Sequence, residues 1–117
     1  MPSIRDLVSA IRRREGVDAA VVLGRDGLVI DGQSVPDINA EDLAAHIPAI
    51  IGAADELGPS VRRGALVTAV LEYGKGLAII SVLTTDVILV VFVRPDTNVG
   101  QLLFELRRNR EHIAALV

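Results

Sequence analysis

The sequence lacks cysteine and tryptophan and contains only one tyrosine, two phenylalanines and one lysine in 117 residues. Without cysteine, the chain has no disulfide scaffold, no thiolate metal site and no cysteine nucleophile. It also has no block of five or more like charges, and its net charge is only -3. This balance argues against bulk electrostatic attraction to nucleic acid or to an anionic membrane.

No apolar run is long enough to span a bilayer. The most apolar region, Leu77 to Val93, is interrupted by Thr84, Thr85 and Asp86, and it falls short of the ~20 residues that a membrane-spanning helix needs. The first fifteen residues carry six charges and lack the apolar stretch of a secretory signal. The sequence therefore predicts a cytoplasmic protein without direct membrane insertion.

Hydrophobic residues are abundant and make up 50% of the chain. This share predicts a packed core and argues against long disorder. At 117 residues, the chain suits one domain, residues 1–117, that buries roughly two-thirds of its unfolded surface.

The stretch "VVLGRDGLVIDG", residues 21–32, places glycines and aspartates in and around two β-rich runs, 17–23 and 28–30. A calcium loop would need carboxylates at alternate positions and a closing glutamate. A phosphate loop would need a helix to begin just after its glycines. Neither pattern is present. The Asp26-Gly27 pair instead predicts a β-hairpin with a type I′ turn, in which both central residues have positive φ.

Apolar residues recur at helical spacing in residues 3–16 and again after Asn98. Ser3 and Asp6 form a capping-box pair at the first helix, and Gly16 provides its stop. Both helices are expected to turn one apolar face inward. The inward residues are Ile4, Leu7, Val8 and Ile11 in the first, and Val99, Leu102, Leu103, Leu106 and Ile113 in the last.

A helix is also predicted between Asn39, its N-cap, and Gly58-Pro59, where it should end. Pro48 lies inside this segment, where it removes one helical hydrogen bond and should kink the helix or mark a restart. The core face follows the 3.6-residue period. Its residues are Leu43, Ile47, Ile50, Ile51, Ala54 and Leu57.

Residues 65–73, 77–83 and 87–93 are typical of three β-strands joined by tight turns. Such short connections force antiparallel neighbours, because a parallel crossover needs a dozen or more residues. The last two strands are apolar on both faces, which indicates that the sheet is covered on both sides. The predicted fold is therefore α/β (α+β), in the order α-β-β-α-β-β-β-α, with a five-stranded antiparallel sheet sandwiched between helices.

Residues able to perform catalysis or bind a metal are few and scattered. His46 and His112 lie on separate predicted helices without a second ligand nearby, and the single lysine, Lys75, lies at a hairpin tip. Ser81 and Thr68 lie within strands, away from any strand-to-helix elbow. Turn and loop roles account best for the aspartates near the first hairpin, which are Asp18, Asp26, Asp31 and Asp37. We therefore expect no enzyme activity, no metal and no cofactor.

The second predicted helix carries an unusual outer face. Opposite its core side, the helical spacing places Asp42, Ala45, Ala49, Gly52, Ala53 and Glu56. An exposed helix face is normally rich in long charged residues, whereas four of these six are small and uncharged. Small residues allow another backbone to approach closely, so the face indicates a contact surface. The alternative is that alanine is simply a good helix former.

The first strand of the meander, residues 65–73, needs only one neighbour and is expected at an edge of the sheet. It is long and apolar, with Glu72 as its one charge and without the lysine or proline that protects many edges. Pairing with its own copy across a two-fold axis would cover it. The strand residues assigned to this interface are Leu66, Thr68, Val70 and Glu72.

Taken together, "GVDAAVVLGRDGLVIDG", the helix "DLAAHIPAIIGAADELG" and the stretch from "LGP" to "NVGQLLFELRR" resemble the Roadblock/dynein light chain family, and within it the prokaryotic members of the MglB type. The resemblance covers nearly the whole chain. It implies a profilin/longin-like fold and a homodimer whose edge strands join and whose second helices lie side by side. It also implies that the paired helices bind Ras-like small GTPases, as a scaffold or as a regulator of hydrolysis. The matching positions are Asp42, Ala45, His46, Ala49, Gly52, Ala53 and Glu56.

Three functions stay open at this point. The favoured one is a non-catalytic dimeric adaptor or regulator of a small GTPase. The second is a structural dimerisation module of a signalling or motility complex without a GTPase partner. The third, a sensor domain for a small ligand, would need a polar-lined pocket, and the predicted sheet offers few buried polar residues.

Overall fold

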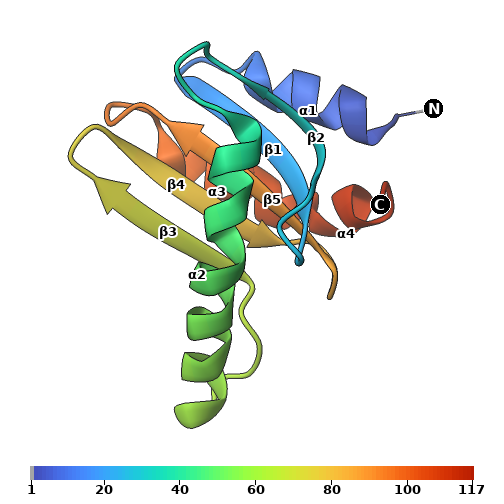
Figure 1. Ribbon diagram of the computed structural model, residues 1–117, viewed down its shortest axis with the longest axis vertical. Helices are drawn as coiled ribbons and strands as arrows, with labels where there is room; N and C mark the ends of the chain where they lie inside the picture. The colour runs from blue at the N-terminus through green and yellow to red at the C-terminus, as the bar shows by residue number, and fades with distance from the viewer. Residues whose placement is uncertain (1) are drawn as a thin grey trace.

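The computed structural model describes residues 2–117 and shows one antiparallel sheet with helices on both faces (Figure 1). The elements, in chain order, are α1 (Ile4–Arg12), β1 (Val17–Gly24), β2 (Val29–Ser34), α2 (Ala40–Ser60), β3 (Thr68–Tyr73), β4 (Gly76–Val82), β5 (Val87–Val93), α3 (Val99–Arg108) and α4 (Arg110–Ala114). The predicted fold class and element order are confirmed, with one addition. The last helix is interrupted at Asn109, whose backbone leaves the helical region and whose side-chain amide donates a hydrogen bond to the Glu105 carbonyl at 2.9 Å.

The strand order in the sheet is β2-β1-β5-β4-β3, and every neighbouring pair is antiparallel. The pairing of β1 with β5 joins the first hairpin to the meander in the middle of the sheet. As a result β2 and β3 are the two edges, and the predicted edge position of the first meander strand is confirmed.

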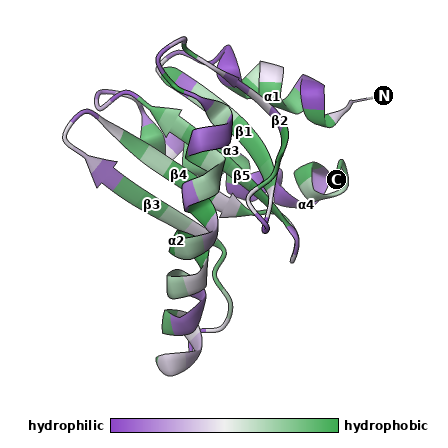
Figure 2. Ribbon diagram, viewed as in Figure 1, coloured by the Kyte–Doolittle hydropathy of each residue, from purple (hydrophilic) through white to green (hydrophobic). Residues whose placement is uncertain are grey.

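Two cores lie on opposite faces of this sheet. One is formed by α2 with Val21, Leu23, Ile80 and Val90, and the other by α1, α3 and α4 with alternate residues of the same central strands. Figure 2 shows the central strands as almost uniformly hydrophobic. Successive side chains of a strand point to opposite faces of the sheet. Because helices pack on both faces, β4 and β5 are apolar along their whole length.

The first hairpin differs from the expected turn. The Gly27 amide donates to the Gly24 carbonyl at 2.9 Å, and Gly27 has φ +91, but Asp26 stays outside the positive-φ region. The type I′ prediction is therefore wrong. The geometry is a type I turn followed by a left-handed glycine. A separate register shift between Val22 and Leu23 of β1 leaves Ile30 of β2 without a partner.

Helix α2 runs through both of its prolines and ends two residues beyond the predicted stop. The Asn39 side chain caps it by accepting from the Asp42 amide at 2.9 Å, as expected. Pro48 leaves the helix uninterrupted, and its ring lies over the hairpin turn, where a Cβ on Gly27 would be only 3.3 Å from it. The proline thus serves as a packing surface between helix and hairpin.

Gly16 is the position where backbone conformation and close packing most clearly require glycine. Its φ is +88, and a Cβ there would lie 2.2 Å from the Thr97 hydroxyl oxygen. We expect Gly16→Ala to lower the free energy of unfolding by about 3 kcal/mol, because it combines a left-handed alanine with a steric clash. Gly74→Ala is the control, since Gly74 has open space around it. Urea denaturation at one protein concentration measures both, and equal midpoints would contradict the assignment.

Candidate interaction surface

All seven helix positions assigned to the interaction face are solvent-exposed on α2, which lies alone on its side of the sheet (Figure 1). An added Cβ on Gly52 would meet no atom within 4 Å. The only polar contact within the set is a 3.9 Å approach of His46 Nε2 to Asp42 Oδ1, between side chains that are 75% and 80% exposed. Such a pair contributes little to stability. The positions of these side chains are therefore set by the helix backbone and not by contacts between them.

The C-terminal half of α2 extends beyond the sheet, which the sequence pattern did not reveal. Ile51 is the last fully buried residue of the helix, whereas Leu57 is 64% exposed and Val61, just after the helix, is 50% exposed. The assignment of Leu57 to the core was therefore wrong. Figure 1 shows the reason: α2 continues past the edge strand β3, so its final turns have no sheet beneath them.

The strand residues assigned to the interface lie on both faces of the sheet. Leu66 precedes β3 and packs in the core under α2. Val70 pairs with Ile79, which belongs to the opposite core, so Val70 and its alternate neighbours Thr68 and Glu72 point away from α2. The predicted residues therefore form no continuous surface, and the helix face and strand face meet only at the open edge of β3.

The two edges of the sheet differ in their protection. Strand β2 has an irregular register beside Ile30 and carries Asp31 and Gly32 in its middle. Bulges and charges of this kind discourage pairing with another strand. Strand β3 pairs regularly with β4 over its whole length, and its Val70 is 43% exposed. Of the two edges, β3 is the one suited to pairing with another chain.

A groove of about 360 Å³ lies between the N-terminal half of α2 and strands β3 and β4. Its walls are largely apolar, and Tyr73 and Phe92 stack on each other in its floor with ring centroids 6.4 Å apart. Sequence reasoning missed this groove. The available signal was that two of the three aromatic residues of the chain occur in strands, but only the strand order shows that they share one face.

The family model of the Roadblock/LC7 domain matches residues 4–92 of this sequence. The chain belongs to the Roadblock/LC7 family. The resemblance seen in the sequence is thereby confirmed.

Other proteins are similar to this Roadblock/LC7 chain over most of their length. Uncharacterized protein MJ1340 of Methanocaldococcus jannaschii is 31% identical over 108 residues, which are 91% of this chain and 92% of that protein. A Roadblock/LC7 domain from Streptomyces avermitilis is 20% identical with a TM-score of 0.82, covering 96% of this chain and 95% of that one. MglB of Myxococcus xanthus is 13% identical with a TM-score of 0.84, covering 98% and 97%. These two structures show a shared fold.

An ion pair fixes α2 of the Roadblock/LC7 domain against its first hairpin. The Arg25 guanidinium lies 2.6 Å from the Asp55 carboxylate and also donates to the Thr85 carbonyl at 2.8 Å. The hydrogen bond from Arg25 lowers the pKa of Asp55 below its ordinary value. This contact is therefore complete above the ordinary carboxyl pKa and is lost as the pH falls through the lowered value. It positions the helix over the sheet.

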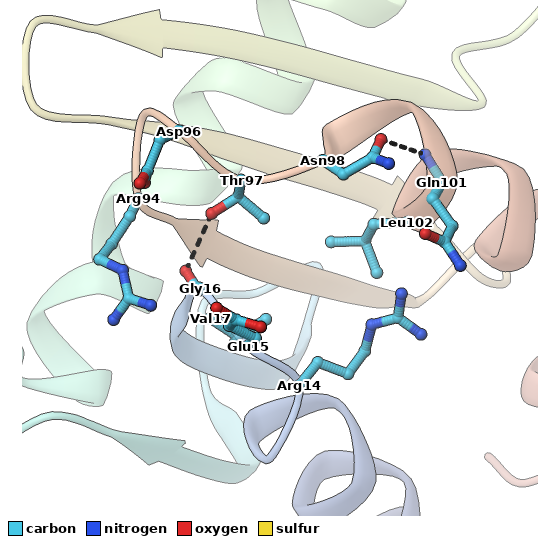
Figure 3. Close-up of a pocket in the computed structure, with 10 residues that line it drawn as sticks. All are labelled: Arg14, Glu15, Gly16, Val17, Arg94, Asp96, Thr97, Asn98, Gln101 and Leu102. Atoms are coloured by element: carbon cyan, nitrogen blue, oxygen red, sulfur yellow. Dashed lines mark hydrogen bonds between the residues drawn. The ribbon is translucent and has the colours of Figure 1, made fainter.

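A second, more polar cavity of about 430 Å³ lies on the other face of the Roadblock/LC7 domain, between the end of α1 and the start of α3 (Figure 3). Its arginines, Arg14 and Arg94, are balanced by two acidic residues, Glu15 and Asp96. Arg14 already forms an ion pair with Glu105. In residues 2–117 no group of three histidine, cysteine, aspartate or glutamate side chains could hold a metal ion. Over the same range no helix combines the length and apolarity that crossing a membrane requires.

Proposed function

We propose that this Roadblock/LC7 domain is a homodimeric adaptor that binds a Ras-like small GTPase, as a scaffold or as a stimulator of its hydrolysis, with no catalytic group of its own. Two observations together carry the proposal: the row of small, exposed side chains on α2, and the unprotected edge of β3. Small exposed side chains let another backbone approach closely, and an unprotected strand edge is open to pairing with another strand. Family membership supports reading the two features as a dimer edge and a partner face.

The outer residues of α2 divide into two sets by their angle around the helix. At 100° per residue, Leu43 and Ile50 lie on the flank beside the groove. Leu57 lies on the same flank of the helix, past the sheet. Ala45, Ala49, Gly52 and Glu56 point away from that flank, towards solvent and the first hairpin. A dimer formed along β3 therefore leaves the small-residue face free for a second protein.

The free face offers no group that could enter a GTPase active site. An arginine supplied in trans can raise GTP hydrolysis by roughly 10³–10⁵, but residues 42–56 contain no arginine. Any stimulation by this domain therefore depends on repositioning the catalytic residues of the GTPase itself. A domain that only recruits the GTPase would bind through the same face.

The test has two stages. Light scattering at micromolar concentration should give about twice the 12.4 kDa chain mass. Calorimetry with purified Ras-like GTPases from the same genome, loaded with GDP or with a non-hydrolysable GTP analogue, should then show binding that depends on the nucleotide. A monomer would contradict the dimer, and a dimer that binds none of these GTPases would instead support a structural dimerisation module.

A further inference from the structure

We propose that the outer surface of α1, α3 and α4, the back face, binds an anionic lipid surface, with Phe104 at the level of the head groups and arginines around it. The side covered by α2 then points away from the lipid, where a protein partner can reach it. This inference goes beyond the proposed function, because it concerns the opposite side of the sheet. It rests on the distribution of charge, on the outer side of α3 and on the shape of the back face.

Charge is divided unevenly between the two sides of the sheet (Figure 1). The segments that cover the back, residues 3–16 and 94–117, contain eight arginines and five acidic residues. The segment on the other side, residues 37–60, contains five acidic residues and neither arginine nor lysine. The low net charge of -3 therefore combines a positive side with a negative side. An anionic surface attracts the first and repels the second, which orients the domain.

The outer side of α3 combines arginines with an exposed aromatic ring. Phe104 is 61% exposed, and the exposed Arg107 and Arg108 lie one helical turn further along the same side. The acidic residue of α3, Glu105, already forms an ion pair with Arg14. Neither Arg107 nor Arg108 has a carboxylate partner within residues 2–117. Arginine beside phenylalanine on one helix is typical of helices that lie in a membrane interface.

The shape of the back face favours a lipid surface over a protein segment. A largely apolar groove of about 250 Å³ lies between α1 and α3, but Phe104, Arg107 and Arg108 are not among the residues that line it. They project instead from the convex side of α3. The side chains that dominate protein interfaces fill well-packed pockets, whereas lipid head groups conform to a convex helix. An acidic protein is therefore the alternative that the experiment must separate.

Symmetric pairing along β3 would double this surface. A two-fold axis that joins two β3 edges is perpendicular to the extended sheet, so both back faces lie on one side and both α2 helices on the other. Two linked copies bind one surface more tightly, because the second contact becomes intramolecular. The attraction itself does not require the dimer. A monomer has the same back face, and its weaker binding should depend on Phe104 and the arginines in the same way.

Cosedimentation with vesicles tests the proposal. The wild type should bind vesicles of phosphatidylcholine with about 30% phosphatidylserine, bind far less to phosphatidylcholine alone, and be released by added salt. One arginine near an anionic surface strengthens binding about fivefold. Arg107→Gln/Arg108→Gln should therefore lower the partition coefficient ~25-fold. Phe104→Ala should lower it about tenfold, because the helix loses its largest apolar group at the interface.

Matched changes elsewhere in the chain are the controls. Leu28→Ala removes an apolar side chain that is 70% exposed at the first hairpin, and it should leave vesicle binding unchanged. Arg62→Gln/Arg63→Gln removes two exposed arginines that follow α2, and it should lower binding by no more than about threefold, because screening weakens charges far from the lipid. Equal losses from the two arginine pairs would show that net charge, and not the back face, sets the binding.

Two further results would overturn the inference. One is a wild type that does not bind the phosphatidylserine vesicles, or whose binding is unaffected by both back-face variants. The other is binding to a poly-glutamate peptide without binding to vesicles, which would assign the back face to an acidic protein. Urea denaturation should give equal midpoints for all variants and thereby exclude loss of the fold. Failure of the dimer or of the GTPase test would leave the vesicle results unaffected.

Discussion

Replacing Val70 with aspartate is expected to raise the dimer dissociation constant about 1000-fold, equivalent to ~4 kcal/mol. Directly opposite residues of an antiparallel pair point to the same face, so symmetric pairing of β3 (Thr68–Tyr73) centres on Val70 or on Leu71. In the first case, the new aspartate faces its own copy. In the second, it faces Glu72 of the other copy. Both registers place like charges together, which costs several kcal/mol at an interface.

Ile30→Asp is the matched control for this prediction. Ile30 is 53% exposed on the other edge strand, compared with 43% for Val70. If the protected β2 edge takes no part in self-association, this variant should dimerise like the wild type. Light scattering across a dilution series compares the three proteins. If Ile30→Asp abolished dimerisation and Val70→Asp did not, the dimer interface would lie at β2, and its assignment to β3 would be wrong.

Ala49→Glu is expected to weaken binding of the GTPase about 100- to 1000-fold, or ~3–4 kcal/mol, while the dimer persists. Ala49 lies on the free side of α2 and is exposed. In an interface of closely approaching backbones, the longer side chain would separate the two proteins and bury an unpaired charge. Without the GTPase, the same change should shift the free energy of unfolding by no more than about 0.5 kcal/mol.

Ala10→Glu introduces the same substitution at an exposed position of α1, on the other face of the sheet. It should leave GTPase binding, dimerisation and stability unchanged. Calorimetric titration of the GTPase with each variant separates the two positions. Equal binding by Ala49→Glu and the wild type would show that the small-residue face of α2 is ordinary solvent-exposed surface.

Elements with strong local signals were predicted well from the sequence. The caps at Ser3 and Asn39 are present as expected, because a capping side chain bonds to amides only a few residues away. The short turns of the meander fixed its antiparallel pairing, and the two-sided apolar pattern of β4 and β5 correctly indicated helices on both faces. Local rules were insufficient at the first turn, where the conformation of Asp26 depends on how two strands meet.

Only part of the candidate site could be predicted from the sequence. The exposure of Ala45, Ala49 and Gly52 follows from helical spacing and is confirmed. The exposure of Leu57 does not follow from it, because periodicity gives the direction of a side chain around its helix but not whether a strand lies beneath it. The groove depends in the same way on the strand order, which brings Tyr73 and Phe92 together.

The sequence by itself determined the elements, their order, their apolar faces and the small side chains along α2, since each of these depends on neighbours along the chain. The tertiary structure decided that β1 and β5 pair in the middle of the sheet, that α2 extends beyond the sheet, and that a groove opens between α2 and strands β3 and β4. Those features arise where segments distant in sequence meet or fail to meet. In the proposed function, these features form the surfaces that a second chain would bind.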